Sequence, residues 1–156
     1  MLTIEIPGRE TLKLKYLVLD FNGTLGQDGK LLPGIASRLN LLANQLQVFI
    51  ISADTFGSVE KELEGVNCEV KIIGPELQNK AKYEFIKTLN CDHVAAVGNG
   101  YNDSLMLKNS ILGLGVIQVE GASSDTIKAA AVVGTDIRDL LDLLIYPDRL
   151  KATLRN

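Results

Sequence analysis

Short apolar runs alternate with helical patterns along most of the 156-residue chain. Apolar runs of about four to eight residues with polar or glycine-containing ends are typical of buried strands, whereas apolar residues three and four positions apart are typical of amphipathic helices. These patterns predict strands at residues 2–6, 12–19, 48–51, 70–73, 94–97, 112–119 and 131–133. They predict helices at residues 35–46, 56–63, 77–89, 103–108, 123–130 and 136–144.

The alternation of strands and helices predicts an α/β protein with a Rossmann-like parallel sheet and helices on both of its faces. Only a turn at residues 7–10, which contains Pro7 and Gly8, separates the first two strands, so we expect an N-terminal edge hairpin there. No repeat, linker or low-complexity segment interrupts the pattern. We therefore expect residues 1–156 to form a single domain.

Composition and charge exclude several classes of function. A formal net charge of −3 provides no basic surface for nucleic acid, so we expect no nucleic-acid partner. The apolar runs are too short to span a membrane, and residues 1–10 lack the apolar core of a signal peptide. Cys68 and Cys91 are isolated, which favours reduced thiols over a disulfide or a metal pair. These features predict a cytoplasmic protein without a membrane partner.

Polar residues follow three of the predicted strands. Residues 20–24 (Asp-Phe-Asn-Gly-Thr) end the second strand, residues 52–54 (Ser-Ala-Asp) follow 48–51, and residues 98–103 (Gly-Asn-Gly-Tyr-Asn-Asp) follow 94–97. The carboxyl ends of parallel strands meet at one edge of the sheet, where ligands of such folds bind. An isolated Asp at a strand end is most simply a turn residue, but three such segments at one edge favour a functional site.

The residue types at this edge suit a phosphate and Mg²⁺. Carboxylate and carboxamide oxygens are hard ligands that Mg²⁺ accepts, while it keeps several of its waters. A hydroxyl and an ammonium group, here from Ser52 and from Lys80 or Lys82, can bind phosphoryl oxygens. Glycines allow backbone N–H groups to approach an anion.

Taken in order, residues 20–24, Ser52, the helix that carries Lys82, and residues 98–103 resemble the four motifs of the haloacid dehalogenase (HAD) superfamily of phosphotransferases. The resemblance covers essentially the whole chain and implies a HAD-like fold. Residues 52–54 and 98–103 are most similar to the phosphorylation domain of P-type ATPases. With no transmembrane segment and no room for a nucleotide-binding insert, the chain resembles the soluble, stand-alone P-type ATPase-like members.

The resemblance implies Mg²⁺-dependent phosphoryl transfer, or hydrolysis of a phosphate ester or phosphoanhydride, through an aspartyl-phosphate on Asp20. It implies a role for each residue of the motifs. The implied catalytic residues are Asp20, Asn22 and Lys82, where Lys82 is favoured over Lys80 because Phe85, Ile86 and Leu89 follow it at the spacing usual for the family. The implied phosphate-binding residues are Gly23, Thr24, Ser52, Ala53 and Lys82. The implied metal ligands, direct or through water, are Asp20, the backbone carbonyl of Asn22, Asn99 and Asp103.

Two positions depart from the pattern of the family's phosphatases. Asn22 stands where those enzymes usually carry an Asp that acts as general acid and base, and Asn99 stands where they usually carry a metal-ligating Asp. A carboxamide cannot transfer a proton, and a positioned acid–base group contributes about 10²–10⁴ in rate. P-type ATPases also lack an Asp at the first position. These departures predict low activity and keep open a second hypothesis, a binding or regulatory protein on the same scaffold.

The intervals between the motifs are short. Asp20 to Ser52 and Ser52 to Lys82 hold only the predicted strands and helices, so we expect no inserted cap domain. An open edge suits a phosphorylated small molecule, a macromolecular substrate, or cover from another subunit of a homo-oligomer. We expect residues 120–123 (Glu-Gly-Ala-Ser) to cap the next helix, with substrate contact as the alternative. A dinucleotide-binding domain is disfavoured because no Gly-x-Gly-x-x-Gly follows the first strand.

Overall fold

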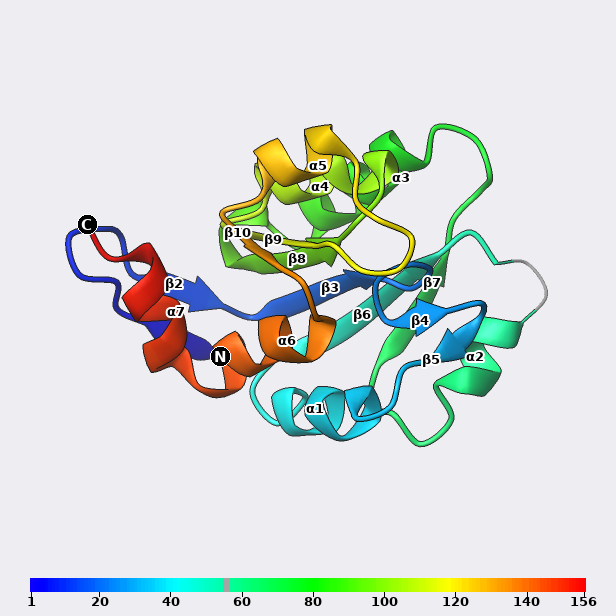
Figure 1. Ribbon diagram of the computed structural model, residues 1–156, viewed down its shortest axis with the longest axis horizontal. Helices are drawn as coiled ribbons and strands as arrows, with labels where there is room; N and C mark the ends of the chain where they lie inside the picture. The colour runs from blue at the N-terminus through cyan, green and yellow to red at the C-terminus, as the bar shows by residue number, and fades with distance from the viewer. Residues whose placement is uncertain (55–56) are drawn as a thin grey trace.

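The computed structural model describes residues 1–54 and 57–156. At its centre is a six-stranded sheet in the order β10-β9-β8-β3-β6-β7, in which every pair of neighbours is parallel (Figure 1). The bounds of the strands are β3 (Tyr16–Asp20), β6 (Gln47–Ser52), β7 (Glu69–Ile72), β8 (Val94–Gly98), β9 (Leu112–Val116) and β10 (Val132–Gly134). The predicted α/β class with a parallel sheet is confirmed.

The chain reverses direction across the sheet at β3. It continues from β3 to β6 and β7 on one side, then returns to β8, β9 and β10 on the other. In an open α/β sheet, the crevice at such a reversal is where ligands bind. The order of the strands therefore selects the carboxyl ends of β3 and β8 as the candidate site.

Helices cover both faces of the sheet (Figure 1). One face carries α3 (Gln78–Thr88), α4 (Ser104–Asn109) and α5 (Ser124–Ala129), and the other carries α1 (Ile35–Leu42), α2 (Ser58–Glu62) and α6 (Ile137–Ile145). Alternate residues of β3 serve the two layers: Leu17 and Leu19 belong to the larger core cluster with α1 and α6, and Val18 belongs to the smaller one with α3 and α4. The start predicted for α2, Phe56, lies outside the described residues.

The N-terminal hairpin is present but forms a separate two-stranded sheet. β1 (Leu2–Ile4) pairs antiparallel with β2 (Leu12–Leu14). The strand predicted at 12–19 is interrupted at Lys15, whose N–H donates to the His93 carbonyl and whose carbonyl accepts from the Gln47 N–H. These two bonds tie the chain to the amino ends of β8 and β6, so β2 leaves the main sheet at this residue.

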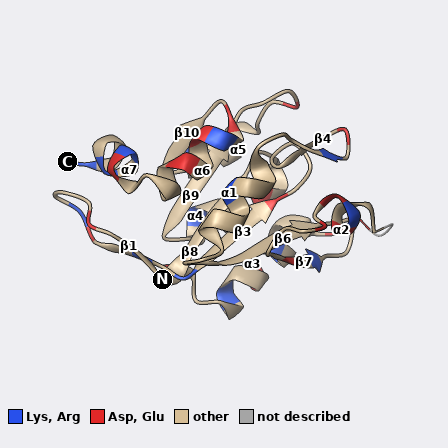
Figure 2. Ribbon diagram, turned by 90° about the horizontal axis from the view of Figure 1, so that it is seen from below, with Lys and Arg blue, Asp and Glu red and all other residues tan. Residues whose placement is uncertain are grey.

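The C-terminal residues form an additional helix, α7 (Pro147–Leu154), that packs beside the hairpin at the end of the molecule where both termini lie (Figure 1). Leu150 is fully buried in the same cluster as Ile4 and Leu14. Basic and acidic residues are both present on α7 (Figure 2); Lys151 Nζ lies 3.0 Å from Asp148 Oδ1, for example. Arg149 and Lys151 therefore belong to a helix with one buried face and both signs of charge on its exposed face.

A second small hairpin, β4 (Gly26–Gln27) and β5 (Lys30–Leu31), follows residues 20–24. Asp28 and Gly29 form its turn, with φ of 51° and 76°, values that these two residue types tolerate. The strand predicted to reach residue 119 ends instead at Val116, and the chain turns at 118–121, where the Gly121 N–H donates to the Gln118 carbonyl. Gly121 has φ 72°, so this turn uses glycine's access to the left-handed region.

Among residues 1–54 and 57–156, no helix combines the length and the apolar character that crossing a membrane requires.

Candidate functional site

The three polar segments predicted from the sequence lie together at the carboxyl edge of the sheet. Asp20 is the last residue of β3, Ser52 is the last residue of β6, and Asn99 directly follows β8. β3 pairs with both β6 and β8, so the three segments are neighbours. The buried polar residues of the described chain are few and six of the seven belong to the predicted motifs: Asp20, Thr24, Ser52, Lys82, Asn99, Asp103 and Thr126.

Lys82 is the centre of this edge. Its side chain is 1% exposed, and its Nζ lies 2.7 Å from Asp20 Oδ1 and 2.6 Å from Asp103 Oδ1. Lys80, the alternative lysine, is exposed on the same helix. Two residues correspond to about 200° of an α-helix, so a helix that turns Lys82 into the sheet edge turns Lys80 toward solvent.

Two carboxylates, Asp20 and Asp103, share the single ammonium group of Lys82, so one negative charge is left without a matching positive charge when both are ionised. Burial, and then the charge of Asp103, raise the pKa of Asp20 from 3.8 to about 7, against the opposing effect of Lys82. Burial alone would lower the pKa of Lys82, but the charges and hydrogen bonds of Asp20 and Asp103 outweigh it and raise that pKa. Lys82 therefore stays protonated, while Asp20 holds an ionised carboxylate less readily than an exposed Asp does.

Both oxygens of Asp103 are occupied by N–H donors. Oδ1 accepts from Lys82, and Oδ2 accepts from the backbone N–H groups of Asn99 at 3.0 Å and Gly100 at 2.9 Å. A Cβ at Gly98 would collide with the Asp103 side chain, so only glycine fits where β8 ends. Asp103 thus fixes the loop after β8 and Lys82 together.

Thr24 joins the first and last motifs. Its hydroxyl is fully buried and lies 3.1 Å from Asp20 Oδ2 and 3.3 Å from Asn99 Oδ1. The Asn99 amide nitrogen donates to the Gly121 carbonyl at 3.1 Å, which directs its amide oxygen toward Thr24. One carboxylate oxygen and one amide oxygen therefore face the same small region beside the hydroxyl.

The loop after Asp20 is a tight turn around the Phe21 carbonyl, which accepts from the N–H groups of Thr24, Leu25 and Gly26 at 2.9–3.1 Å. Phe21 is fully buried and its ring would lie 2.6 Å from a Cβ at Gly26. Gly23 has φ 78°, in the left-handed region. Asn22 is exposed at the tip of this turn.

The second motif is ordered by local hydrogen bonds. Ser52 is 3% exposed, and its Oγ accepts from the Asp54 N–H at 3.1 Å. Ala53 is half-buried beside it. The Asp54 carboxylate accepts from the Ser58 hydroxyl at 2.6 Å and the Val59 N–H at 3.0 Å, so it satisfies a backbone N–H in the first turn of α2.

Sequence reasoning missed Gln118 and gave Glu120 only a minor place. The Gln118 amide nitrogen donates to the carbonyls of Gly23 at 3.3 Å and Thr24 at 2.9 Å, and its amide oxygen accepts from the Ile137 N–H at 3.0 Å. A side-chain amide in an expected strand carries no sign of such a role. The Glu120 carboxylate lies against Gly23, where an added Cβ would collide with it.

Within the described ranges, no group of three or more His, Cys, Asp or Glu side chains is arranged to hold a metal ion. One of the oxygens beside the Thr24 hydroxyl belongs to the side-chain amide of Asn99, and Asn is not among the four residue types in that group. A cation site here would thus depend on carboxamide and backbone oxygens as well as on Asp20.

A cavity of about 450 Å³ adjoins the loop after Asp20. It is lined by Gly23, Gly26, Gln27, Leu32, Gln118, Val119, Glu120, Thr135, Asp136 and Arg138. Asp136 and Arg138 form a two-contact ion pair with each other at 2.8 and 2.5 Å. Apart from the Glu120 carboxylate, the cavity therefore presents mostly backbone, apolar and mutually neutralised groups beside the loop after Asp20.

The chain is similar in sequence to two proteins of one archaeon. No protein-family model matches it. The chain is 54% identical over 63 residues to the uncharacterized protein MJ0073 of Methanocaldococcus jannaschii, a match that spans 40% of this chain and 68% of that protein. It is 44% identical over 39 residues to MJ0072 of the same organism, over 25% of this chain and 89% of that protein.

Solved structures share the fold at low identity. A 3-deoxy-D-manno-octulosonate 8-phosphate phosphatase from Moraxella catarrhalis, solved with magnesium, phosphate and the sugar acid, has a TM-score of 0.71 at 16% identity and covers 91% of this chain and 94% of its own. A protein of Legionella pneumophila described as a subfamily III A hydrolase of the HAD superfamily has a TM-score of 0.72 at 21% identity, with coverage of 92% and 88%. The cobalt-bound octulosonate phosphatase of Haemophilus influenzae has a TM-score of 0.70 at 12% identity.

Proposed function

We propose that this chain, which belongs to one family with MJ0073 of M. jannaschii and has the fold of the haloacid dehalogenase superfamily, is a Mg²⁺-dependent enzyme that transfers or hydrolyses phosphoryl groups through Asp20. The observation that carries the proposal is the buried Lys82 between Asp20 and Asp103 at the switch point of the sheet. A buried carboxylate with a perturbed pKa at such an edge, here Asp20, is a candidate catalytic group.

In this proposal Asp20 is the nucleophile. Its carboxylate oxygen forms a bond to phosphorus, the bond from phosphorus to the leaving group breaks, and the leaving group departs with the bonding electrons. Lys82 donates to Asp20 at 2.7 Å and holds positive charge where the phosphoryl oxygens arrive. Asp103 orients Lys82 through Oδ1, and its other oxygen accepts from two backbone N–H groups. We therefore assign Asp103 a positioning role rather than a direct contact with the metal.

The oxygens beside Thr24 fit a hard cation. Asp20 Oδ2 and Asn99 Oδ1 both approach the Thr24 hydroxyl, and Mg²⁺ binds few protein oxygens and keeps several waters. We propose that Asp20, the Asn22 carbonyl and Asn99 hold Mg²⁺. The cation supplies charge neutralisation for the phosphoryl group when it is bound.

The remaining motif residues form the proposed phosphoryl pocket. Gly23 and Thr24 line it from the tight turn after Asp20, and Ser52 and Ala53 line it from the end of β6. The N–H groups of Gly23 and Thr24 already donate to the carbonyls of Gly26 and Phe21, so the group that this turn offers to a phosphoryl oxygen is the Thr24 hydroxyl. The turn is fixed by the Phe21 carbonyl, so its groups are ordered before an anion arrives. Such preorganised donors are effective because they do not reorganise during the reaction.

Asn22 sets the expected chemistry of the leaving group. With an exposed amide at this position, no carboxylic acid is available there to protonate an alkoxide leaving group or to activate water against the phosphorylated Asp20. We propose that acyl phosphates and phosphoanhydrides, whose leaving groups depart as stable anions, react faster than alkyl phosphates. The alternative is a binding or regulatory protein with little turnover. It is favoured by the amides of Asn22 and Asn99, because neither supplies a carboxylate.

The substrate we propose is a phosphorylated small molecule. The phosphatases of M. catarrhalis and H. influenzae that share the fold act on a phosphorylated sugar acid by name. The cavity of about 450 Å³ beside Gly23 has the volume of a small-molecule site. Apart from Glu120, its charged side chains Asp136 and Arg138 are paired with each other, so most of it suits an uncharged part of a leaving group.

A covalent labelling experiment tests this function. The wild-type chain is incubated with acetyl phosphate and Mg²⁺, and intact-mass spectrometry measures the fraction that gains one phosphoryl group. We expect a Mg²⁺-dependent adduct on Asp20 that is absent from Asp20→Asn. The matched control is Asp28→Asn, which removes a carboxylate from the nearby exposed turn, where Asn also tolerates the positive φ.

Phosphorylation that persists in Asp20→Asn would contradict the assignment of the nucleophile. A wild-type chain that forms no adduct and binds no fluoroberyllate in the presence of Mg²⁺ would contradict the enzyme and leave the binding protein as the better hypothesis.

A further inference from the structure

We propose that Glu120 supplies a second carboxylate to the divalent cation of this site, in place of the charge that Asn99 does not carry. The inference rests on the proposed function, since it concerns the same cation. Glu120 lies on the turn 118–121 that follows β9, outside the four motifs.

The turn that carries Glu120 is attached to the site on both sides of this residue. Before it, the Gln118 amide nitrogen donates to the carbonyls of Gly23 and Thr24. After it, the Gly121 carbonyl accepts from the Asn99 amide nitrogen at 3.1 Å. The Gly121 N–H closes the turn on the Gln118 carbonyl at 2.8 Å. The position of Glu120 is therefore fixed relative to both loops that would contact the cation.

The carboxylate of Glu120 points into the site. A Cβ placed on Gly23 would collide with Glu120 Oε2 and would lie 2.5 Å from Asn99 Nδ2 and 2.9 Å from Asn99 Oδ1. Glycine at position 23 thus leaves a space bordered by both the Glu120 carboxylate and the Asn99 amide. Asn99 Oδ1 in turn approaches the hydroxyl of Thr24, which contacts Asp20.

Glu120 has no competing cation among residues 1–54 and 57–156. None of the ion pairs in this part of the chain includes it. Arg138 lines the same cavity, but its guanidinium is taken by Asp136 in two contacts. A carboxylate held at the edge of the site without a partner is available to a cation.

Charge balance gives the reason for a second carboxylate. The trio of Asp20, Asp103 and Lys82 carries one net negative charge when ionised, and the Asn99 amide adds none. The affinity of oxygen-ligand sites for hard cations is tuned by the charge of their ligands. With Glu120, the site carries two negative charges, which match a divalent ion.

Metal binding without substrate tests this role. Mn²⁺ is titrated into the metal-free full-length chain, free Mn²⁺ is measured by electron paramagnetic resonance, and Mg²⁺ binding is measured by competition. We expect Glu120→Gln to weaken Mn²⁺ binding by about 10–100-fold, the scale found when a residue that supports a metal site is removed. Adding Asn99→Asp to Glu120→Gln should restore most of the affinity, because it returns a carboxylate to the same space.

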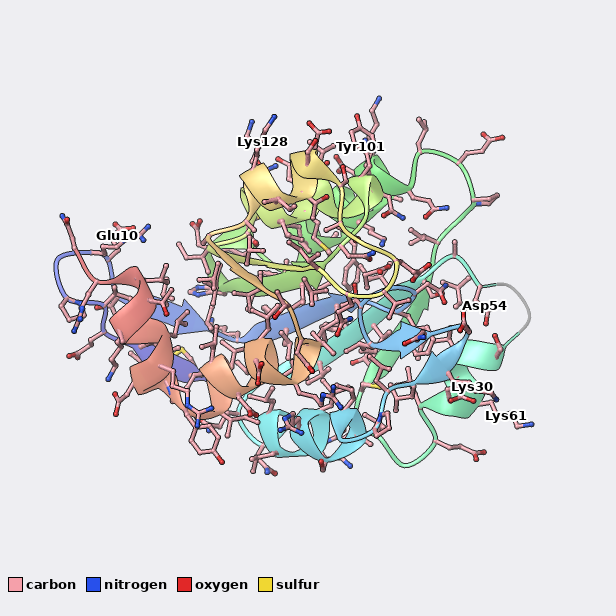
Figure 3. All side chains as sticks on the ribbon, in the orientation of Figure 1. Glu10, Lys30, Asp54, Lys61, Tyr101 and Lys128 are labelled. Carbon is pink, nitrogen blue, oxygen red and sulfur yellow. The ribbon has the colours of Figure 1, made fainter. Side chains whose placement is uncertain are left out.

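Two further variants make the result specific. Glu10→Gln removes the same charge from the hairpin at the opposite end of the molecule and should leave the affinity unchanged (Figure 3). Asp20→Asn should weaken binding at least as much as Glu120→Gln. Thermal unfolding checks that each variant is folded, which is expected for Glu120→Gln because Glu120 is exposed.

The outcomes separate this inference from the proposed function. Equal Mn²⁺ affinity in Glu120→Gln and the wild type, with a loss in Asp20→Asn, would overturn the role of Glu120 and leave the phosphoryl-transfer site intact. An equal loss of affinity in Glu10→Gln would show that only the overall charge of the protein matters, and it would also overturn the role of Glu120. A wild-type chain that binds no Mn²⁺ would overturn both.

Discussion

The two ends of the central sheet both bury side chains almost completely, but they bury different kinds. At the amino end, the β1–β2 hairpin and α7 enclose apolar residues such as Ile4, Leu14 and Leu150, all of them 0% exposed. At the carboxyl end, Lys82 and Asp103 are as deeply buried, at 1% and 0% exposure. Burial alone therefore does not distinguish the two ends; the desolvated charges of the second do.

The buried apolar residues at the amino end stabilise the fold, whereas the buried charges at the carboxyl end are not explained by stability. Removing apolar surface from water contributes roughly 25 cal/mol per Å² of area. A buried ion pair often contributes nothing relative to apolar residues of the same shape, since desolvation cancels the attraction between the charges. Stability thus gives no reason for Asp20, Lys82 and Asp103 at the carboxyl edge. We therefore attribute their arrangement to the chemistry that we propose for that edge.

The largest effect is expected for Lys82→Met. It leaves the buried carboxylates of Asp20 and Asp103 without their cation, and loss of one partner of a buried ionic group costs about 3–5 kcal/mol. Urea unfolding measures the loss of stability, and the labelling reaction measures the loss of the phosphoryl adduct. Lys80→Met, an equal change on the exposed face of the same helix, should leave both measurements close to wild type.

The hairpin end provides the contrast to Lys82→Met. Leu14→Ala should cost about 2–5 kcal/mol through lost burial and a cavity, with a normal adduct on the folded protein. If Leu14→Ala abolished the adduct while the chain was folded, or if Lys82→Met kept it, the proposed division between the two ends would be wrong.

Most of the fold follows from patterns that are local in the sequence. The apolar run before Asp20 and the later strand–helix alternation predict the central sheet, because period and burial are coupled over a few residues. The exceptions depend on contacts between distant residues. β2 separates from β3 because Lys15 is hydrogen-bonded to His93, just before β8, and to Gln47 of β6, and α7 is fixed by Leu150 against the hairpin. No pattern within either segment encodes those contacts.

The site divides in the same way. Asp20, Ser52 and Lys82 could be predicted because each follows a recognisable strand or lies in a recognisable helix. The contributions of Gln118 and Glu120 could not, because they depend on where the turn at 118–121 meets the loop after Asp20, across almost one hundred positions of sequence. The roles of the predicted residues in phosphate and metal binding remain predictions.

The next largest effect is expected for Asn22. This residue is exposed in the site, whereas Leu14 at the other end of the sheet is buried. Asn22→Asp introduces a carboxyl group that can transfer a proton, worth about 10²–10⁴ in rate. We expect a rise toward this scale for an alkyl phosphate and a much smaller one for p-nitrophenyl phosphate, whose leaving group needs no proton. Steady-state kinetics on both substrates measures it.

The control for Asn22→Asp is Asn44→Asp, which adds the same charge at an exposed position shortly before β6 begins, toward the amino end of the sheet. It should change neither substrate's rate. Equal rates for the two substrates in Asn22→Asp, whether unchanged or lower, would show that a proton donor at this position is not what limits the reaction.

The smallest effect is expected for the stability of Asp20→Asn and depends on pH. In the unfolded chain Asp20 loses its proton near its ordinary pKa of 3.8, whereas burial and then Asp103 raise the folded pKa to about 7. Between these values the folded state holds a proton that the unfolded state has lost, so stability falls as pH rises. The contribution of Asp20 is complete below about pH 4 and is lost as the pH rises through about 7.

Asn carries no charge at any of these pH values. Metal-free Asp20→Asn should therefore be more stable than the wild type at pH 8. The rise in the pKa of Asp20 from 3.8 to about 7 is about three units at about 1.4 kcal/mol each, so this gain in stability should reach at most about 4 kcal/mol. The difference should shrink at pH 4.5, where wild-type Asp20 is protonated in the folded state. Urea unfolding at the two pH values measures it. Saturating Mg²⁺ should reduce the difference at pH 8, since a cation favours the ionised carboxylate. A variant that is less stable than the wild type at pH 8 without metal would mean that the Asp20 carboxylate stabilises the fold, as the apolar residues at the other end of the sheet do.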